Sequence, residues 1–225
     1  MLLANHPGNS DIDSWINDSC RFINYTSIMP TLAYSIRNSL YLNITNRCSN
    51  ACSFCIKLNS STGDENDLFL DTEPSFDEIM AAIAEFSDFE EVVFCGYGES
   101  LLRFDIVKQV AEAVKQKYCT RVRINTDGQA NLVHGRNIIP ELAGVVDCFS
   151  VSLNAPDAET YMRLCHSPFG AAAFIGVCDF IRLAAAEIPE VIASVVRVTS
   201  LDVEACKALA LSLGASFRLR PYYQG

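Results

Sequence analysis

Residues 147–154 read DCFSVSLN, and this segment shows the pattern that decides the fold class. In an extended strand, Phe149, Val151 and Leu153 point to one face, and the polar residues between them point to the other. A doubly wound sheet carries helices on both faces, so its strands are apolar on both. One polar face instead favours a curved sheet with helices outside and a solvated or ligand-filled interior.

Other segments of the chain repeat this alternation. In the stretch 216–222, for example, Phe217 and Leu219 oppose Arg218 and Arg220. The strands expected on this basis span residues 40–45, 91–95, 121–125, 147–153, 191–198 and 216–222. Helical periodicity and capping residues predict helices over residues 75–86, 104–117, 157–165, 170–186 and 201–213, with a shorter one near 138–143.

Strands that alternate with helices imply a parallel sheet with right-handed crossovers. Six strand–helix units are too few for the eight of a closed barrel. We therefore expect an α/β protein, a partial (β/α)6 TIM-like barrel of parallel strands with helices outside. An open doubly wound sheet is the alternative. The barrel domain is expected over residues 39–225, and residues 1–38 are expected to form an irregular or partly helical N-terminal extension.

Composition narrows the class of protein. The chain has 225 residues, half of them apolar, which is enough for one sizeable core. Its 17 basic and 27 acidic residues give a net charge of −10, which argues against nucleic-acid binding by the outer surface. No apolar run approaches the ~20 residues that span a bilayer. The opening residues MLLANHPGNSDID lack the features of a signal peptide, so we expect a cytoplasmic protein with no membrane contact.

Three of the ten cysteines are clustered in one loop. Cys48, Cys52 and Cys55 have the spacing C-x3-C-x2-C directly after the first expected strand. Structural zinc sites supply four ligands, usually in pairs, and no second pair follows here. A ferredoxin run requires a fourth cysteine about three residues further on, which is also missing. Three thiolates at this spacing can ligate three irons of a [4Fe–4S] cluster and leave the fourth iron open.

This loop resembles the signature of the radical S-adenosylmethionine (SAM) superfamily, C-x3-C-x-aromatic-C, in which Phe54 supplies the aromatic residue. The resemblance implies a [4Fe–4S] cluster held by Cys48, Cys52 and Cys55, with SAM bound at the open iron. It also implies reductive cleavage of SAM to a 5′-deoxyadenosyl radical that abstracts hydrogen from a substrate. An external reductant, such as a flavodoxin or a ferredoxin-like protein, is then required as a partner.

Further segments match the superfamily at the ends of later strands. Tyr97-Gly98-Glu99-Ser100 resembles its Gly-Gly-Glu-Pro segment, with Tyr in place of the first glycine and Ser in place of the proline, and the resemblance implies that Glu99 meets the methionine amine. Asn125, Ser152 and Asn154 lie where barrel enzymes place their sites, although such residues also simply initiate turns. The candidate cofactor-binding residues are Phe54, Gly96, Tyr97, Gly98, Glu99, Asn125, Ser152, Asn154 and Arg197, and no catalytic residue is assigned.

Several arginines are expected inside the barrel. The strand alternation points Arg123, Arg218 and Arg220 inward, and Arg197 follows the fifth strand. Guanidinium groups bind carboxylates and phosphates in bidentate fashion, which suggests an anionic small-molecule substrate. Two alternatives stay open: the arginines pair with acidic residues of the barrel itself, or one of them holds the carboxylate of the cofactor.

Longer strings carry a closer resemblance. SLYLNITNRCSNACSFC, FCGYGESLLR, NTDGQANLVHGRNIIPEL and VSLNAPDAETYMRLC are similar to the TatD-associated radical SAM proteins, which implies a TatD-type nuclease as a further partner. The substrate is not implied. Alternative functions are an activase that makes a glycyl radical on a partner protein, an enzyme of deazapurine biosynthesis, an iron–sulfur electron-transfer module, and a TatD-nuclease accessory without catalysis of its own.

Overall fold

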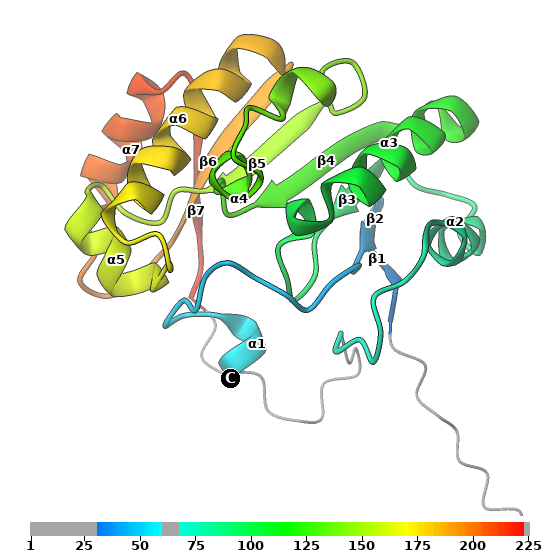
Figure 1. Cartoon of the computed structure of the whole chain (residues 1–225), viewed down its shortest axis with the longest axis horizontal. Helices are drawn as coiled ribbons and strands as arrows, with labels where there is room; N and C mark the ends of the chain where they lie inside the picture. Colours follow the sequence, from blue (N-terminus) through cyan, green and yellow to red (C-terminus); the bar gives the residue numbers. More distant parts are fainter. Residues whose placement is uncertain (1–30, 60–67, 223–225) are drawn as a thin grey trace, which may run out of the picture.

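The structure is a computed structural model that describes residues 31–59 and 68–222. One seven-stranded sheet forms its centre, and its strands follow one another in sequence order from one edge to the other. The strands are β1 (Ala33–Ile36), β2 (Ser39–Leu42), β3 (Glu91–Phe94), β4 (Arg121–Thr126), β5 (Cys148–Ser152), β6 (Glu190–Val196) and β7 (Ser216–Arg220). Only β1 is antiparallel to its neighbour, and β2 to β7 are parallel (Figure 1).

Helices connect the parallel strands. They are α1 (Ile56–Asn59), α2 (Phe76–Ala84), η1 (Ser100–Arg103), α3 (Phe104–Tyr118), α4 (Ala130–His134), η2 (Ile139–Glu141), α5 (Ala158–Cys165), α6 (Ala171–Glu187) and α7 (Val203–Ser212). The predicted capping box of α2 is present, because Ser75 and Glu78 exchange side-chain-to-backbone hydrogen bonds. Within the described residues, no helix is long and apolar enough to cross a membrane.

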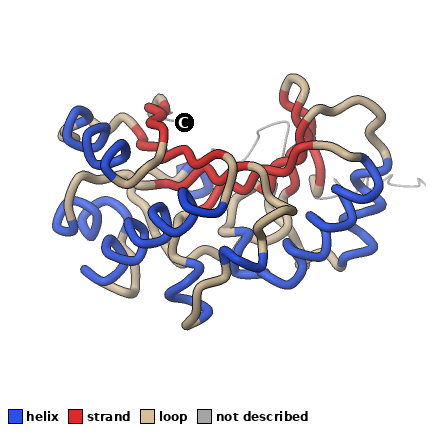
Figure 2. Tube along the Cα trace, turned by 90° about the horizontal axis from the view of Figure 1, so that it is seen from above, coloured by secondary structure: helices blue, strands red, loops and turns tan. Residues whose placement is uncertain are grey.

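The sheet is arched. Figure 2 shows the strands as one curved layer with the long helices on one side. The predicted α/β class with six parallel strands is confirmed. The sheet ends in two open edges, β1 and β7, which do not pair with each other, so the described strands do not close into a ring.

The N-terminal edge differs from the expectation. Residues 33–36 fall inside the predicted extension, yet they form β1 and pair with β2. A tight turn at Arg37, with a φ of 54°, reverses the chain, and the ring of Tyr34 stacks on Tyr41 with centroids 5.4 Å apart. Four residues give too short an alternation to be recognised without the partner strand. The domain boundary at residue 39 stays a prediction, and residues 1–30 lie outside the described part.

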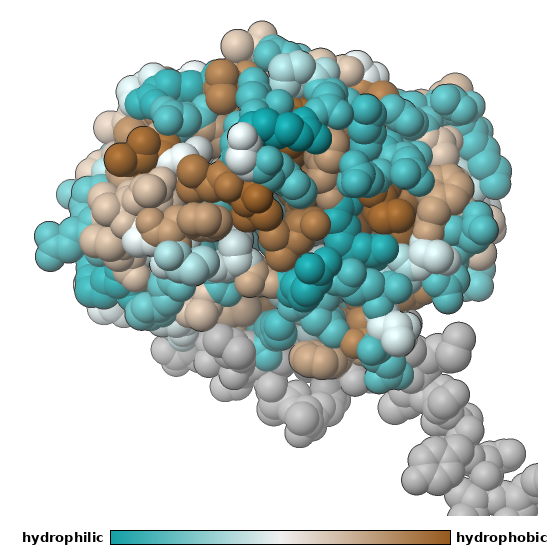
Figure 3. Space-filling model, in the orientation of Figure 1, coloured by the Kyte–Doolittle hydropathy of each residue, from teal (hydrophilic) through white to brown (hydrophobic). Residues whose placement is uncertain are grey.

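The helix-covered face of the sheet holds the core. Leu42, Phe94, Ile124, Phe149 and Val191 lie in register across five parallel strands, and all are buried. The opposite face carries mostly polar residues, as the strand alternation predicts, although Val93 and Ile192 are buried on it. On the outer surface of the helices, hydrophobic residues appear in short stretches separated by hydrophilic ones (Figure 3).

Replacement of Phe149 tests the importance of this row. Phe149 is completely buried, and its ring meets Phe180 edge-on with centroids 5.2 Å apart. Phe149→Ala is expected to lower the free energy of unfolding by about 3–5 kcal/mol, because it removes buried contacts and leaves a cavity. Urea denaturation followed by circular dichroism measures this loss. Phe169→Ala serves as the control, since Phe169 is 37% exposed, and an equal loss in both variants would contradict the core assignment.

Candidate functional site

The three clustered cysteines lie in the loop between β2 and α1, beyond the carboxyl end of the first parallel strand. Cys48 is exposed, whereas Cys52 and Cys55 are half-buried. Phe54, between the last two, is buried and belongs to the hydrophobic core. The aromatic residue therefore anchors the loop in the core while the sulfur atoms stay nearer the surface. Its predicted contact with the cofactor remains a prediction.

Backbone hydrogen bonds attach this loop to the end of α5. The amide of Ala51 donates to the carbonyl of Cys165 at 3.1 Å, and the amide of Ser53 donates to the carbonyl of Leu164 at 3.0 Å. These two bonds lie on either side of Cys52. The position of Cys52 is thus fixed by a helix more than a hundred residues away in the sequence.

Side-chain hydrogen bonds attach the loop to the segment after β4. Ser49 donates to the carboxylate of Asp127 through a short hydrogen bond. The side-chain nitrogen Nε2 of Gln129 donates to Asn50 Oδ1 at 2.8 Å. Asn50 Nδ2 in turn donates to the hydroxyl of Tyr161 at 3.3 Å. The sequence interpretation did not assign site roles to any of these residues. The only signal in the sequence was that residues 125–128 lie at the end of a predicted strand.

Glu99 lies at the centre of the site, at the carboxyl end of β3. It is 4% exposed, and Oε1 accepts hydrogen bonds from the amide of Leu101 and the hydroxyl of Thr126, both at 3.0 Å. Its other oxygen accepts from the amide of Asp127 at 2.6 Å. The loops after β3 and β4 are therefore joined at this carboxylate.

Two acidic side chains are buried together here. Burial and, next, the charge of Asp127 raise the pKa of Glu99, and burial raises the pKa of Asp127. Both shifts arise because a buried carboxylate loses its hydration, and Glu99 in addition faces the negative charge of Asp127. A cationic group bound beside the pair would favour its ionised form. The arrangement suits the amine that the sequence resemblance assigns to Glu99, and that assignment remains a prediction.

The two glycines before Glu99 allow close contact between the end of β3 and the cysteine loop. A Cβ atom on Gly98 would lie 2.4 Å from the backbone oxygens of both Thr45 and Arg47. A Cβ on Gly96 would lie 2.0 Å from Asn43 Oδ1. The two glycines therefore allow the segment after β3 to lie against residues 43–47 of the same chain.

The other predicted cofactor-binding residues lie at or beyond the ends of β3, β4, β5 and β6. Tyr97 lies between the two glycines, and its amide donates to Asn43 Oδ1 at 3.4 Å. Asn125 and Ser152 are half-buried at the ends of β4 and β5. Asn154 is 3% exposed, with a φ of 56°. Arg197 has an exposed side chain beyond β6 and joins no other described residue through its guanidinium. The cofactor-binding roles of all five remain predictions.

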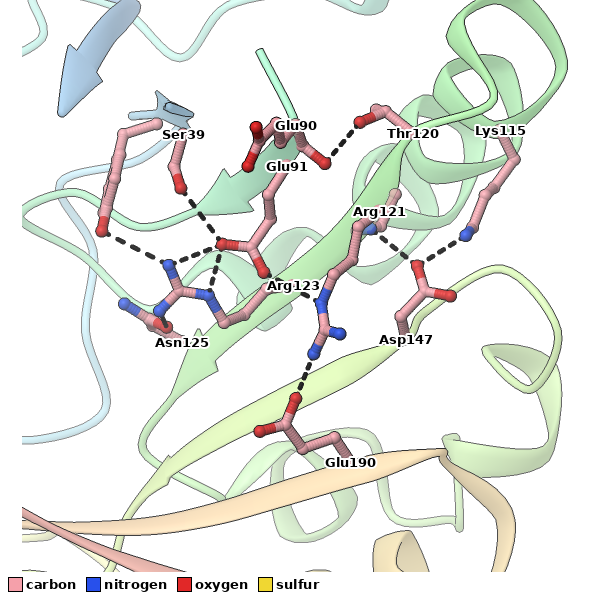
Figure 4. A network of polar contacts seen from close by, with 12 residues as sticks. Ser39, Glu90, Glu91, Lys115, Thr120, Arg121, Arg123, Asn125, Asp147 and Glu190 are labelled. Carbon is pink, nitrogen blue, oxygen red and sulfur yellow. Dashed lines mark hydrogen bonds and ion pairs between the residues drawn. The ribbon is translucent and has the colours of Figure 1, made fainter. Parts of the chain in front are cut away.

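One of the expected inward arginines already has an acidic partner. Arg123 Nη2 lies 2.9 Å from Glu91 Oε2, and the guanidinium also donates to the hydroxyl of Tyr41 at 3.3 Å. Figure 4 shows this cluster, in which Arg121 bridges Glu91 and Glu190. For Arg123, the alternative of a structural ion pair is thus confirmed.

The three thiols of the cysteine loop are the candidate ligands of a [4Fe–4S] cluster. The neighbouring thiol of Cys165, followed by burial, raises the pKa of Cys52. Iron ligation would displace the thiol protons, as metals do at such sites. Among the described residues, no three side chains of His, Cys, Asp or Glu are grouped for one metal ion. A cubane takes each thiolate on a different iron, so the three thiols of one loop fit it.

Comparisons with known proteins agree with this chemistry. No curated protein sequence matches the chain. The crystal structure of SuiB from Streptococcus suis is similar with a TM-score of 0.58 and 14% identity, covering 80% of this chain and 38% of SuiB. A radical SAM methyltransferase from Sphaerobacter thermophilus is similar with a TM-score of 0.52 and 15% identity, covering 84% and 68%.

At these identities the likeness concerns the fold, and the chain spans well under half the length of SuiB. The family model gives the stronger finding. The model described as the Radical SAM superfamily matches residues 42–201, which include the cysteine loop, Glu99 and the strands from β3 to β6. A [4Fe–4S] cluster and SAM follow from that family. The chain belongs to the Radical SAM superfamily.

Proposed function

We propose that this chain cleaves SAM reductively and uses the resulting radical to abstract hydrogen from an anionic small molecule. The cluster, when bound, supplies the electron for cleavage, and Cys48, Cys52 and Cys55 would hold it. The observation that carries the proposal is the attachment of the cysteine loop at the carboxyl edge of the sheet: Ser49 donates to Asp127, and the carbonyl of Arg47 accepts the amide of Glu99. The arched sheet acts as a partial barrel whose concave face receives the substrate.

The anionic character of the substrate is supported by Arg220. Among the described residues, its buried Nε atom has no hydrogen-bond partner, and its Nη2 donates only to the hydroxyl of Ser152 at 3.3 Å. Burial and the charge of Arg218, two residues earlier on the same strand face, lower the pKa of Arg220. Neither arginine has an acidic partner in the described part of the chain.

A cation that is partly removed from water is normally paired, because desolvation without compensation is costly. Arg220 ends β7 and its guanidinium reaches Ser152 at the end of β5, so it lies at the same carboxyl edge of the sheet from which the cysteine loop starts. A carboxylate or phosphate bound there would satisfy the free Nε and offset the repulsion between the two arginines. Such an anion would hold a substrate beside the site where the radical forms.

The proposal also names the protein partners and the subgroup of the superfamily. A flavodoxin or a ferredoxin-like protein supplies the electron, and the chain belongs to the TatD-associated group within the superfamily. The support for that group is the sequence resemblance of the four quoted segments, which extend over β2 to α5. Under this proposal, a TatD-type nuclease is a partner rather than the substrate.

Serine substitution tests the cluster. After anaerobic reconstitution, wild-type protein is expected to bind four irons per chain and to form 5′-deoxyadenosine from SAM with dithionite. Cys48→Ser, Cys52→Ser and Cys55→Ser are each expected to lose most of the iron and all product, because each removes one thiolate. Iron assay and chromatography measure the two quantities. Cys119→Ser is the control, since Cys119 is exposed and lies outside the loop.

The outcomes separate the candidate functions. Zinc or no metal in the reconstituted wild type would overturn the proposal. A full cluster without 5′-deoxyadenosine would instead favour an electron-transfer module. Product formation that rises with an added protein rather than a metabolite would favour an activase.

Arg220→Met tests the anion site. Without added anions, this variant is expected to unfold at a higher temperature than wild type, because a partly desolvated charge that pairs with no acid of the described residues is removed. Citrate, inorganic phosphate and pyrophosphate are the probes, each compared with chloride at equal ionic strength. At least one should raise the unfolding temperature of wild type and leave Arg220→Met unchanged. Arg182→Met is the control, since Arg182 is exposed and pairs with Asp179.

Arg220 could bind an anionic group of the substrate or the carboxylate of the cofactor. Binding of S-adenosylhomocysteine to the reconstituted protein distinguishes these two possibilities. Arg220→Met should retain this binding if the guanidinium serves the substrate. Loss of binding would assign Arg220 to the carboxylate of the cofactor. Equal responses of wild type and variant to every anion would remove Arg220 from the site.

A further inference from the structure

Gln129 is a buried polar residue that contacts several parts of the site. It directly precedes α4 and is completely buried. Its Nε2 atom donates to Asn50 Oδ1 in the cysteine loop at 2.8 Å, and it lies 3.3 Å from both Asp127 Oδ2 and the hydroxyl of Tyr161. One amide group thus joins the loops after β2 and β4 to helix α5.

Ser167 fixes the orientation of this amide group. The backbone amide of Phe169 donates to Ser167 Oγ at 3.3 Å, so the hydroxyl proton is left for Gln129 Oε1, which lies 2.5 Å away. With its oxygen held there, Gln129 turns its nitrogen toward the site. The reversed amide would place an oxygen against the carboxylate of Asp127 and against Asn50 Oδ1, which are both acceptors. The observed orientation therefore satisfies the network, and the reversed one does not.

Asn50 is the residue through which the cysteine loop receives this contact. It lies between Cys48 and Cys52, and its Nδ2 donates to the hydroxyl of Tyr161 at 3.3 Å. The oxygen and the nitrogen of the Asn50 amide are thus both bound to residues outside the loop. Because Gln129 and Tyr161 are completely buried, water competes little for these hydrogen bonds.

We propose that Gln129 is a positioning residue that holds Asn50, and through it the cysteine loop, in the conformation that receives the cluster before the cluster is bound. The inference rests on the cluster site of the proposed function. Where a metal site is not formed in advance, the free energy of ordering its ligands is taken from metal binding. A buried hydrogen-bond network that specifies one loop conformation removes that loss.

Hydrogen exchange of the full chain before reconstitution tests the proposal. Gln129→Met keeps a side chain of similar length and removes its hydrogen bonds, and mass spectrometry follows the amides of residues 49–54. The variant is expected to exchange about fivefold faster in this loop, which is the effect of one net hydrogen bond on an opening equilibrium. Strand β6 is the internal reference and should keep its wild-type exchange rate.

Thr120→Val is the matched control. Thr120 is also buried, and its hydroxyl donates to the carbonyl of Glu90 at 2.7 Å, just before β4 begins (Figure 4). This substitution removes a buried hydrogen bond that does not involve the cysteine loop, so exchange in residues 49–54 should equal that of wild type.

Asn50→Ala decides whether Gln129 acts through Asn50. In the double variant, the increase in loop exchange should be close to that of Asn50→Ala alone, whereas the two increases multiply if the residues act independently. Independent increases would overturn the proposal, and so would loop exchange unchanged by Gln129→Met. An equal rise in the loop and in β6 would show a merely structural role and would also overturn it.

Ser167→Ala is the second variant if Gln129→Met fails to fold. It removes only the hydroxyl that orients Gln129, and it should also raise exchange in residues 49–54. Unchanged exchange in Ser167→Ala would then contradict the proposal.

Reconstitution separates this inference from the proposed function. Reconstituted Gln129→Met is expected to release iron to a chelator faster than wild type and Thr120→Val. Faster loop exchange with unchanged iron release would break the link between Gln129 and the cluster and overturn the proposal. A wild type that takes up no cluster would instead defeat the proposed function, while the exchange rates still show whether Gln129 fixes the loop.

Discussion

The parallel pairing of β2 to β7 is the constraint on which the site depends. Because these strands run in one direction, their carboxyl ends meet at one edge of the sheet, and each following loop begins there. Glu99 follows β3, Asp127 follows β4, and the cysteine loop follows β2. Residues that lie tens of positions apart are thus brought within hydrogen-bond distance by strand direction alone.

The site contains acidic and basic groups that no opposite charge accompanies among the described residues. Glu99 and Asp127 are buried together as two acids, while Arg220 is half-buried, its Nε atom is buried, and no acidic side chain of residues 31–59 or 68–222 pairs with it. Elsewhere on the concave face, Arg123 is paired with Glu91. The contrast indicates that the polar face has a structural part at the amino ends of the strands and a part at the carboxyl ends that is suited to ligands.

The cysteine loop is held more firmly than its sequence suggests. It contains serines and asparagines that could equally form a solvated turn. Instead, Ser49 and Asn50 are bound to residues after β4, and the backbone around Cys52 is bound to the end of α5. Phe54 adds burial in the core. A loop fixed on three sides can keep its thiols at constant spacing while its outer surface, at Cys48, remains open.

The sequence by itself determined the alternation of strands and helices, the polar face of the sheet and the cysteine spacing, because these depend on local periodicity and on neighbours within one loop. It could not find β1, whose four residues are defined only by pairing with β2. Nor could it find Gln129, Tyr161 or Cys165, because their roles come from contacts across more than thirty residues. Likewise, only the tertiary structure decided that Arg123 is paired with an acid, whereas Arg220 meets no acid in the part of the chain that the structure describes, since burial and partners are properties of the packed molecule.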